Sequence, residues 1–258
     1  MIDFFDKLAL DAKSTIVSGY YQKIAPVKPM HLSLKTSITQ CIRVPIISEL
    51  KAASPSKGLI RKDFVAKETA IAMAKGGAIG ISVLTEPKHF NGSLENLTEV
   101  RRAVNLPILM KDFVLSSAQL DAAARAGANV VLLIQTLFDR GYCESGVEEM
   151  IAEAHSKNLE VLLETHTQDE FNRAVGTEAD LIGINNRNLG TLKIDLNTTR
   201  NILSQNSNKN KIIVSESGIN SPADIRFLKD CGTRAFLIGS AVMQSDNIME
   251  KVREFVNS

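Results

Sequence analysis

Cysteine and histidine are both scarce in this sequence. The three cysteines, Cys41, Cys143 and Cys231, are far apart and odd in number, which argues against a disulfide framework and favours reduced thiols. The four histidines have neither metal-ligand spacing nor cysteine partners. We therefore expect no structural zinc and no other metal site.

Neither sign of charge dominates, and long apolar runs are absent. Lys and Arg number 30 against 29 Asp and Glu, and no basic block favours nucleic-acid binding. No run approaches the roughly 20 apolar residues that a membrane span needs. The first residues include Asp3 and Asp6 and lack the basic start and apolar core of a secretory signal. These absences predict a soluble cytoplasmic protein with no nucleic-acid or membrane partner.

Eight short runs rich in Ile, Leu and Val are the main positive feature. They begin near residues 46, 79, 107, 129, 159, 180, 211 and 235. Amphipathic stretches lie between them, for example residues 93–104, 116–126, 145–157 and 221–231. Alternating strands and helices predict an α/β fold with a parallel sheet, and eight units favour a (β/α)8 TIM barrel that spans residues 1–258 as one domain. An open doubly wound sheet is the alternative, because strand order cannot be read from a sequence.

Residues 1–45 precede the first strand and predict an N-terminal helical extension. Phe5, Leu8, Ala12 and Ile16 fall on one helical face. A second short helix is expected over residues 32–41. The segment is too short to be a domain, so we expect it to pack on the barrel, either closing one end or covering the mouth of the site.

Charged side chains come at the ends of several apolar runs. Residues two apart on a strand share a face, so Glu49 and Lys51 point the same way, as do Asn185 and Arg187. The remaining members of this set are Lys111 and Glu164. A surface salt bridge is the alternative for any one of them. Together they predict one site at the barrel mouth for an anionic substrate, with acid–base chemistry.

Glycine and serine follow the last two runs. Ser217 and Gly218 follow the seventh run, and Gly239 and Ser240 follow the eighth. The loops after these two strands of a barrel often bind phosphate through backbone N–H groups. Ordinary turns are the alternative, but the joint occurrence predicts a phosphate site. The stretch at residues 54–58 (SPSKG) is a weaker signal for a loop that brings a hydroxyl, such as that of Ser54, or a cation near the same anion.

Two neighbours of these residues have no assigned catalytic role. His166 lies two residues beyond Glu164, so it lines the mouth or supports the site from behind. Asp112 follows Lys111 directly, should point the opposite way, and is interpreted as structural.

In this order, the clusters resemble the indole-3-glycerol phosphate synthase family. The matching stretches are residues 49–58 (ELKAASPSKG), 82–93 (SVLTEPKHFNGS), 111–113 (KDF), 163–167 (LETHT), 183–189 (GINNRNL), 215–219 (SESGI) and 238–240 (IGS). The resemblance implies ring closure of 1-(2-carboxyphenylamino)-1-deoxyribulose 5-phosphate, an anionic sugar phosphate, in tryptophan biosynthesis. Carbon dioxide and water are lost, and no cofactor is needed.

The resemblance also implies a role for each site residue. Lys111 resembles the general acid of ring closure, and Lys51 and Glu164 the acid–base pair of dehydration, in an order the sequence leaves open. Glu49 would orient the lysines. The residues that would bind the substrate are Asn185, Arg187 and Glu216, with Ser217, Gly218, Gly239 and Ser240 around the phosphate. Those of an apolar slot for the aromatic ring are Pro55, Phe90, Phe113 and Leu189, for which core packing is the alternative.

Two other functions fit parts of the pattern. Phosphoribosylanthranilate isomerase would need a cysteine and an aspartate at strand ends, whereas Cys41 precedes the first strand. A non-catalytic sugar-phosphate-binding barrel would lack the charged strand ends. No second set of eight units follows, so we expect a monofunctional enzyme that is a monomer or a weak homo-oligomer.

Overall fold

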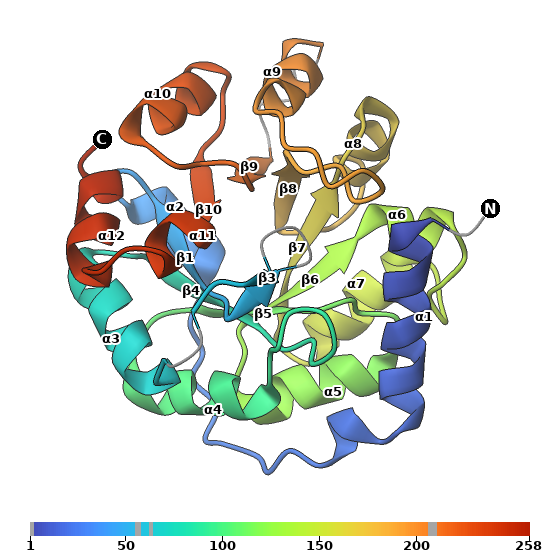
Figure 1. Ribbon diagram of the computed structural model, residues 1–258. Helices are drawn as coiled ribbons and strands as arrows, with labels where there is room; N and C mark the ends of the chain where they lie inside the picture. The colour runs from blue at the N-terminus through green and yellow to red at the C-terminus, as the bar shows by residue number, and fades with distance from the viewer. Residues whose placement is uncertain (1–2, 55–57, 62–63, 206–210) are drawn as a thin grey trace.

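Eight parallel strands close into a barrel in the computed structural model, which describes residues 3–54, 58–61, 64–205 and 211–258 (Figure 1). The strands are β1 (Ile46–Leu50), β4 (Gly80–Leu84), β5 (Ile108–Lys111), β6 (Val130–Ile134), β7 (Glu160–Thr165), β8 (Leu181–Asn185), β9 (Ile212–Glu216) and β10 (Ala235–Ile238). Strand β1 pairs with both β4 and β10, which closes the sheet. This pairing confirms the predicted TIM barrel and excludes the open sheet.

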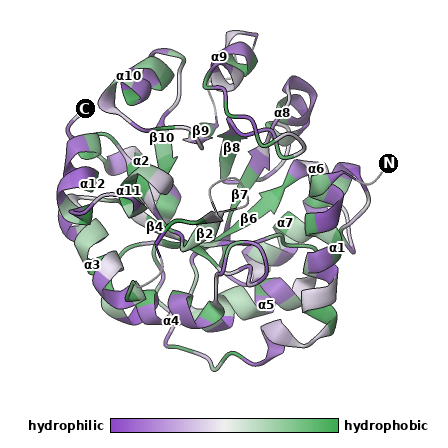
Figure 2. Ribbon diagram, in the orientation of Figure 1, coloured by the Kyte–Doolittle hydropathy of each residue, from purple (hydrophilic) through white to green (hydrophobic). Residues whose placement is uncertain are grey.

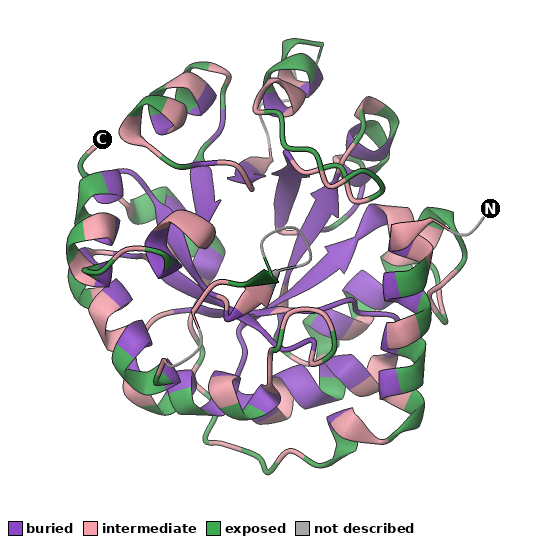
Figure 3. Cartoon of the chain, viewed as in Figure 1, coloured by how far each residue is buried: buried purple, intermediate pink, exposed green. Residues whose placement is uncertain are grey.

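Helices surround the barrel and cover the outer face of its strands. They are α3 (Ala66–Gly76), α4 (Leu94–Ala103), α5 (Ser117–Ala126), α7 (Val147–Ser156), α8 (Gln168–Ala174), α9 (Asn197–Ser204), α10 (Pro222–Asp230) and α12 (Ile248–Val256). Each helix buries hydrophobic residues, and hydrophobic and buried residues alternate with hydrophilic and exposed ones along the helices (Figure 2, Figure 3). Within the described ranges, no helix is long and apolar enough to cross a membrane.

Local sequence explains where these helices begin and end. The side chain of Ser221 accepts a hydrogen bond from the N–H of Asp224, and Pro222 occupies the first turn of α10, where a proline costs no backbone hydrogen bond. Helices α3 and α5 end at Gly77 and Gly127, whose φ angles are +101° and +88°, a conformation that glycine adopts without strain.

Short elements in the loops are absent from the sequence-based expectations. They are the 3₁₀ helix η1 (Tyr20–Gln22), the antiparallel hairpin of β2 (Ala53–Ser54) and β3 (Gly58–Leu59), and the short helices α6 (Gln135–Asp139) and α11 (Ser240–Met243). They span two to five residues each, too few to leave a hydrophobic period in the sequence.

Alternate residues of each strand pack inside and outside the barrel. Ile47, Leu109 and Leu162 belong to an inner apolar cluster, whereas Ile46 and Ile108 belong to the cluster between strands and helices. This alternation follows from the two-residue period of a strand. It also decides which polar side chains reach the interior at the carboxyl ends of the strands.

The N-terminal segment packs on both ends of the barrel. Helix α2 (Leu34–Gln40) buries Leu34 and Ile38 in the inner cluster at the amino ends of the strands, where Glu160, the first residue of β7, accepts hydrogen bonds from its first turn. Helix α1 (Phe4–Val17) buries Phe5 and Leu8 in the same cluster at the opposite end. The two alternatives for this segment are therefore both realised, one by each helix.

Ion pairs hold α1 across the carboxyl end of the barrel. Arg140, from the loop after α6, lies 2.9 Å from Asp3 and 2.6 Å from Asp6. Asp11 contacts His89, from the loop after β4, at 2.8 Å. These contacts join α1 to two loops of the mouth, so its inner face becomes part of the site.

We predict that Ile38→Ala destabilises the fold by about 2–4 kcal/mol, because it leaves a cavity beneath the inner cluster. The side chain of Ile38 is fully buried, whereas Ile42, a few residues later, is 99% exposed. Ile42→Ala is the matched control and should change the free energy of unfolding by less than about 0.5 kcal/mol. Urea unfolding measures both free-energy changes. Equal changes would contradict a role for α2 in closing the amino end of the barrel.

Candidate active site

A layer of four side chains lies above the inner apolar cluster. Glu49, Lys111, Glu164 and Glu216 come from β1, β5, β7 and β9, which are alternate strands of the barrel. Each lies two residues beyond an inner-facing apolar residue of its own strand, namely Ile47, Leu109, Leu162 and Val214. Layers of four residues from alternate strands are how a closed barrel fills its interior. The fold therefore stacks one charged layer on one apolar layer.

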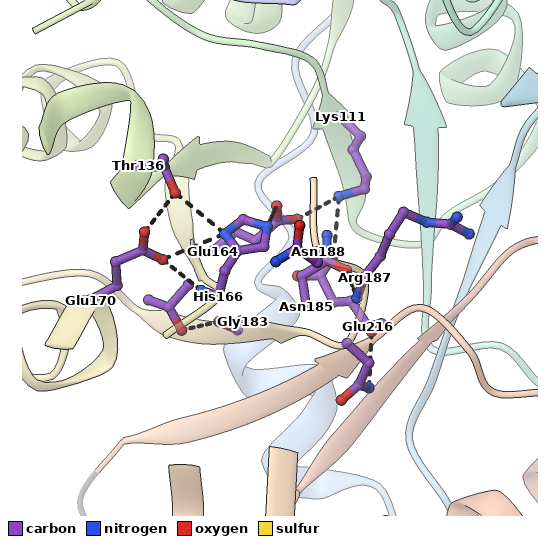
Figure 4. A network of polar contacts seen from close by, with 12 residues as sticks. Lys111, Thr136, Glu164, His166, Glu170, Gly183, Asn185, Arg187, Asn188 and Glu216 are labelled. Carbon is purple, nitrogen blue, oxygen red and sulfur yellow. Dashed lines mark hydrogen bonds and ion pairs between the residues drawn. The ribbon is translucent and has the colours of Figure 1, made fainter. Parts of the chain in front are cut away.

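Lys111 lies between two buried carboxylates. Its Nζ atom is 3.0 Å from Oε2 of Glu164 and 3.0 Å from Oε2 of Glu216 (Figure 4). Both glutamates are about 1% exposed. The structure therefore brings Lys111 and Glu164 together, and Glu216 joins them.

A second ion pair and an arginine lie beside this layer. Lys51 Nζ is 2.6 Å from Oε1 of Glu49, as expected for two residues on one strand face. The side chain of Asn185 accepts a hydrogen bond from the backbone N–H of Arg187 at 2.9 Å. Burial lowers the pKa of Arg187, and the charge of Glu49 opposes this shift. The two groups therefore interact electrostatically across the mouth of the barrel.

The two carboxylates beside Lys111 differ in protonation. Burial alone would raise the pKa of Glu164, but Lys111 and His166 lower it well below its usual range. Burial raises the pKa of Glu216 to about 8, against the pull of Lys111 and with the repulsion of Glu164. Burial would lower the pKa of Lys111, but Glu164, Glu216 and Glu49 raise it. At neutral pH, Glu164 is charged, Glu216 carries a proton and Lys111 is an ammonium.

Two adjoining cavities open above these groups. The first is mainly apolar and contains Lys111 and Glu164; its apolar lining is Phe4, Leu8, Leu84, Phe90, Phe113, Leu132, Ile134, Leu189 and Leu192. The second lies at the ends of β9 and β10 and is lined by Ile194, Ser217, Gly218, Ile219, Asn220, Leu237, Ile238, Gly239 and Ser240. Glu49, Lys51, Arg187 and Ser217 line both. The cationic groups at this junction suit a ligand with an aromatic end and an anionic end.

Two glycines make room for carboxylates of the layer. A Cβ on Gly183 would lie 2.4 Å from Oε1 of Glu216, and one on Gly239 would lie 2.4 Å from Oε1 of Glu49. Any side chain at these positions would displace the glutamate. Gly239, which the sequence predicts near phosphate, thus also accommodates Glu49.

The turn after β9 is held in an unusual conformation. Ser217 and Gly218 have φ angles of +67° and +83°. The side chain of Asn186 donates to the carbonyl oxygens of Glu216 and Ser217 at 3.0 and 3.2 Å. This side chain is buried and fixes the turn that borders the second cavity. The sequence predicts no role for Asn186, because a buried amide leaves no signal distinct from its neighbours.

Most of the residues predicted for the site line the two cavities. Glu49, Lys51, Phe90, Lys111, Phe113, Glu164, Asn185, Arg187, Leu189 and Ser217 line the first, and Gly218, Gly239 and Ser240 the second. Glu216 is absent from both linings and contacts Lys111 within the charged layer. Ser54 lies in β2, and Pro55 lies outside the described residues.

Helix α1 supplies two residues to the lining of the first cavity, and neither was predicted to lie in the site. Leu8 was expected on the buried face of this helix, and Phe4 was not singled out; both line the apolar cavity. Glu86, also in that lining, accepts the N–H groups of His89 and Phe90 at 2.7 and 3.1 Å. Glu86 therefore shapes the turn that presents Phe90.

Asp112 is among the residues that line the first cavity, and its hydrogen bonds also hold the barrel wall together. Its Oδ2 accepts hydrogen bonds from the hydroxyls of Tyr21 and Thr85 at 2.9 and 2.6 Å. Burial raises its pKa to about 7. These partners agree with the structural role predicted for it. Among the residues that the structure describes, no group of three or more His, Cys, Asp and Glu could hold a metal ion.

We predict that Glu216→Gln becomes more stable relative to the unmodified protein as pH rises from about 5 to about 9. The pKa of Glu216 is raised from 4.5 to about 8 in the folded protein, so its stabilising contribution is complete below about pH 4.5 and is lost as pH rises through about 8. Glutamine stays neutral throughout. Urea unfolding at several pH values measures the difference, with exposed Glu99→Gln as the control; a pH-independent difference would contradict a protonated Glu216.

Two solved structures share the fold. The chain is similar to thiamine phosphate pyrophosphorylase from Pyrococcus furiosus, with a TM-score of 0.60 at 16% identity over 86% of this chain and 96% of that one. It is also similar to N-acetylmannosamine-6-phosphate 2-epimerase from Clostridium perfringens, with a TM-score of 0.60 at 14% identity over 84% of this chain and 93% of that one. These similarities support the barrel architecture alone.

Sequence comparisons identify the family. The family model described as indole-3-glycerol phosphate synthase matches residues 7–255. The indole-3-glycerol phosphate synthase of Methanocaldococcus jannaschii is 46% identical over 231 residues, 89% of this chain and 84% of that protein. That of Aliarcobacter butzleri is 38% identical over 90% of this chain and 85% of that protein. The chain therefore belongs to the indole-3-glycerol phosphate synthase family.

Proposed function

We propose that Lys111, Lys51 and Glu164 carry out the proton transfers of the family reaction at this site. As a family member, the chain is a carboxy-lyase of tryptophan biosynthesis, which closes the ring of 1-(2-carboxyphenylamino)-1-deoxyribulose 5-phosphate and releases carbon dioxide and water. One observation carries the assignment of roles: an ammonium lies 3.0 Å from two buried carboxylates in the wall of an apolar cavity.

The two cavities match the two ends of this substrate. The aromatic ring fits the apolar cavity, where the rings of Phe90 and Phe113 lie 6.1 Å apart. The phosphate fits the second cavity, beside the backbone of Gly218 and Gly239 and the hydroxyl of Ser240. The ribulose chain then crosses the junction near Lys51, where a cation compensates the substrate's negative charge.

Ring closure is the step assigned to Lys111. The aromatic carbon that bears the carboxylate attacks the ketone carbon, and the ketone oxygen takes a proton from the Lys111 ammonium. The flanking carboxylates keep this lysine fully protonated before the reaction. The alkoxide that would otherwise form is a far stronger base than a lysine amine, so the transfer is downhill even with a raised pKa.

Two further steps complete the reaction. Loss of carbon dioxide from the ring carbon that formed the new bond restores aromaticity and leaves a hydroxyl on the new five-membered ring. Dehydration then needs a base that removes a proton from the adjacent methylene carbon and an acid that protonates the leaving hydroxyl. Glu164 is ionised in the free site, which suits the base. Lys51, paired with Glu49 at 2.6 Å, then serves as the acid.

The substrate is the only partner that this proposal requires. The near-neutral charge of the chain gives no support for a nucleic-acid partner. We propose further that the enzyme acts in the cytoplasm, as a monomer or a weak homo-oligomer, which agrees with its few and scattered cysteines.

We predict that Lys111→Ala lowers kcat/KM by at least about 1,000-fold, because both the acid and its positive charge are lost. Glu164→Gln should also lower the rate severely. The assay follows indole fluorescence after adding the carboxyphenylamino ribulose phosphate to purified protein, with circular dichroism as the test of folding. Lys35→Ala, at a mostly exposed lysine, is the control. Lack of turnover by the unmodified protein would favour a non-catalytic binding barrel.

We predict that Ser240→Asp raises KM by about 10- to 100-fold with a smaller effect on kcat. A carboxylate at the start of α11 would repel the substrate phosphate in the second cavity, which is remote from the bonds that change. Inorganic phosphate should inhibit the unmodified enzyme competitively and the variant more weakly. Ser156→Asp, on an exposed helix face, is the control, and an unchanged KM for Ser240→Asp would remove this cavity from phosphate binding.

A further inference from the structure

Glu164 contacts a second cation on the side away from the substrate cavity. Its Oε2 faces Lys111, whereas its Oε1 lies 3.2 Å from Nε2 of His166 (Figure 4). Nε2 of His166 has no hydrogen-bond partner among the described residues, so its contact with Glu164 is an ion pair. Each oxygen of the carboxylate therefore has its own cationic partner.

Contacts with Glu170 and Thr136 hold His166 in place. Glu170, in the first turn of α8, accepts the backbone N–H of His166 at 2.6 Å and lies 3.5 Å from its Nδ1. The hydroxyl of Thr136, on α6, donates to Glu170 at 2.7 Å and lies 3.4 Å from the same ring nitrogen. Both ring nitrogens of His166 thus have partners on fixed elements, which defines the orientation of the ring.

The surroundings of His166 favour its charged form. Burial would lower its pKa, but contacts with Glu164 and Glu170 raise it to about 9. The charged and titratable groups next to Glu164 and His166 are Lys111 from β5, Glu216 from β9 and Glu170 from α8, and Glu49 from β1 acts on Lys111 and Glu216. Lys111 and His166 are the two cations of this set, and both contact Glu164.

The two cations that contact Glu164, Lys111 and His166, have different roles in the reaction. In the proposed function, Lys111 turns its proton to the substrate ketone and so leaves Glu164 with less compensating charge. His166 lies outside the layer that faces the substrate and is absent from the lining of both cavities. Its contact with Glu164 therefore persists when Lys111 engages the substrate.

We propose that His166, supported by Glu170 and Thr136, is a positioning residue that keeps Glu164 ionised and aimed at the substrate while Lys111 acts as the acid. This inference rests on the proposed function. It gives the dehydration base a source of positive charge that takes no part in proton transfer. It also explains why the residue two positions beyond the base is a histidine buried against a second glutamate.

The test compares pH profiles of kcat for His166→Gln and the unmodified enzyme. We expect kcat to fall about 10- to 100-fold, part of the full effect of an acid–base group, with KM changed less than about threefold. The acidic limb of the profile should move up by about one pH unit, because Glu164 loses an opposite charge. His155→Gln removes a similar pair, His155 with Asp180 at 2.9 Å on the surface, and should leave kcat and the limb unchanged.

Two further measurements keep the inference testable if His166→Gln folds poorly. Glu170→Gln retains an acceptor for the backbone of His166 but removes the charge, so it should move the acidic limb in the same direction by a smaller amount. Nitrogen NMR of the unmodified protein should show His166 doubly protonated at pH 7, independently of any turnover. A neutral His166, or an unmoved limb in an active Glu170→Gln variant, would overturn the proposal, whereas an inactive unmodified enzyme with a charged His166 would instead contradict the proposed function.

Discussion

The ammonium of Lys111 between two buried carboxylates is the interaction on which the charge of the whole site depends. A buried charge is costly without partners, and Glu164 and Glu216 at 3.0 Å supply them. One ammonium cannot compensate two full negative charges. The pKa of Glu164 is therefore lowered, which favours its ionised form, and the pKa of Glu216 is raised, which favours its protonated form. In the proposed function, the ammonium of Lys111 then supplies the acid and the carboxylate of Glu164 the base.

Closure of the barrel is what makes this arrangement possible. The four residues of the charged layer come from alternate strands and are separated by 45 or more positions along the chain. Each follows an inward-facing apolar residue by two positions, so the apolar layer below sets both the height and the direction of the charged layer. Helix α2 lies below these two layers and helix α1 lies across the mouth of the barrel. The two helices therefore enclose the layers at both ends.

The two cavities separate binding from chemistry. In the proposed function, the substrate phosphate lies against backbone and a hydroxyl after the last two strands, whereas the aromatic ring lies against side chains from α1 and the loops after β4, β5 and β8. Lys51 and Arg187 stand at the junction, where negative charge from either end of the substrate is within reach. Behind the layer, His166 and Glu170 add charge that no cavity exposes, so the electrostatics of the base depend on residues beyond the cavity wall.

The sequence by itself determined the strand periodicity, the ends at which the polar residues lie and the chemical class of the site. Eight apolar runs and their charged ends were sufficient for this, because the two-residue period of a strand links each charge to a face. Only the tertiary structure decided that Phe4 and Leu8 line the cavity, that Gly183 and Gly239 make room for carboxylates, and that burial raises the pKa of Glu216 whereas Lys111 and His166 lower that of Glu164. Those properties depend on distances between strands far apart in the chain and on burial, which no local pattern encodes.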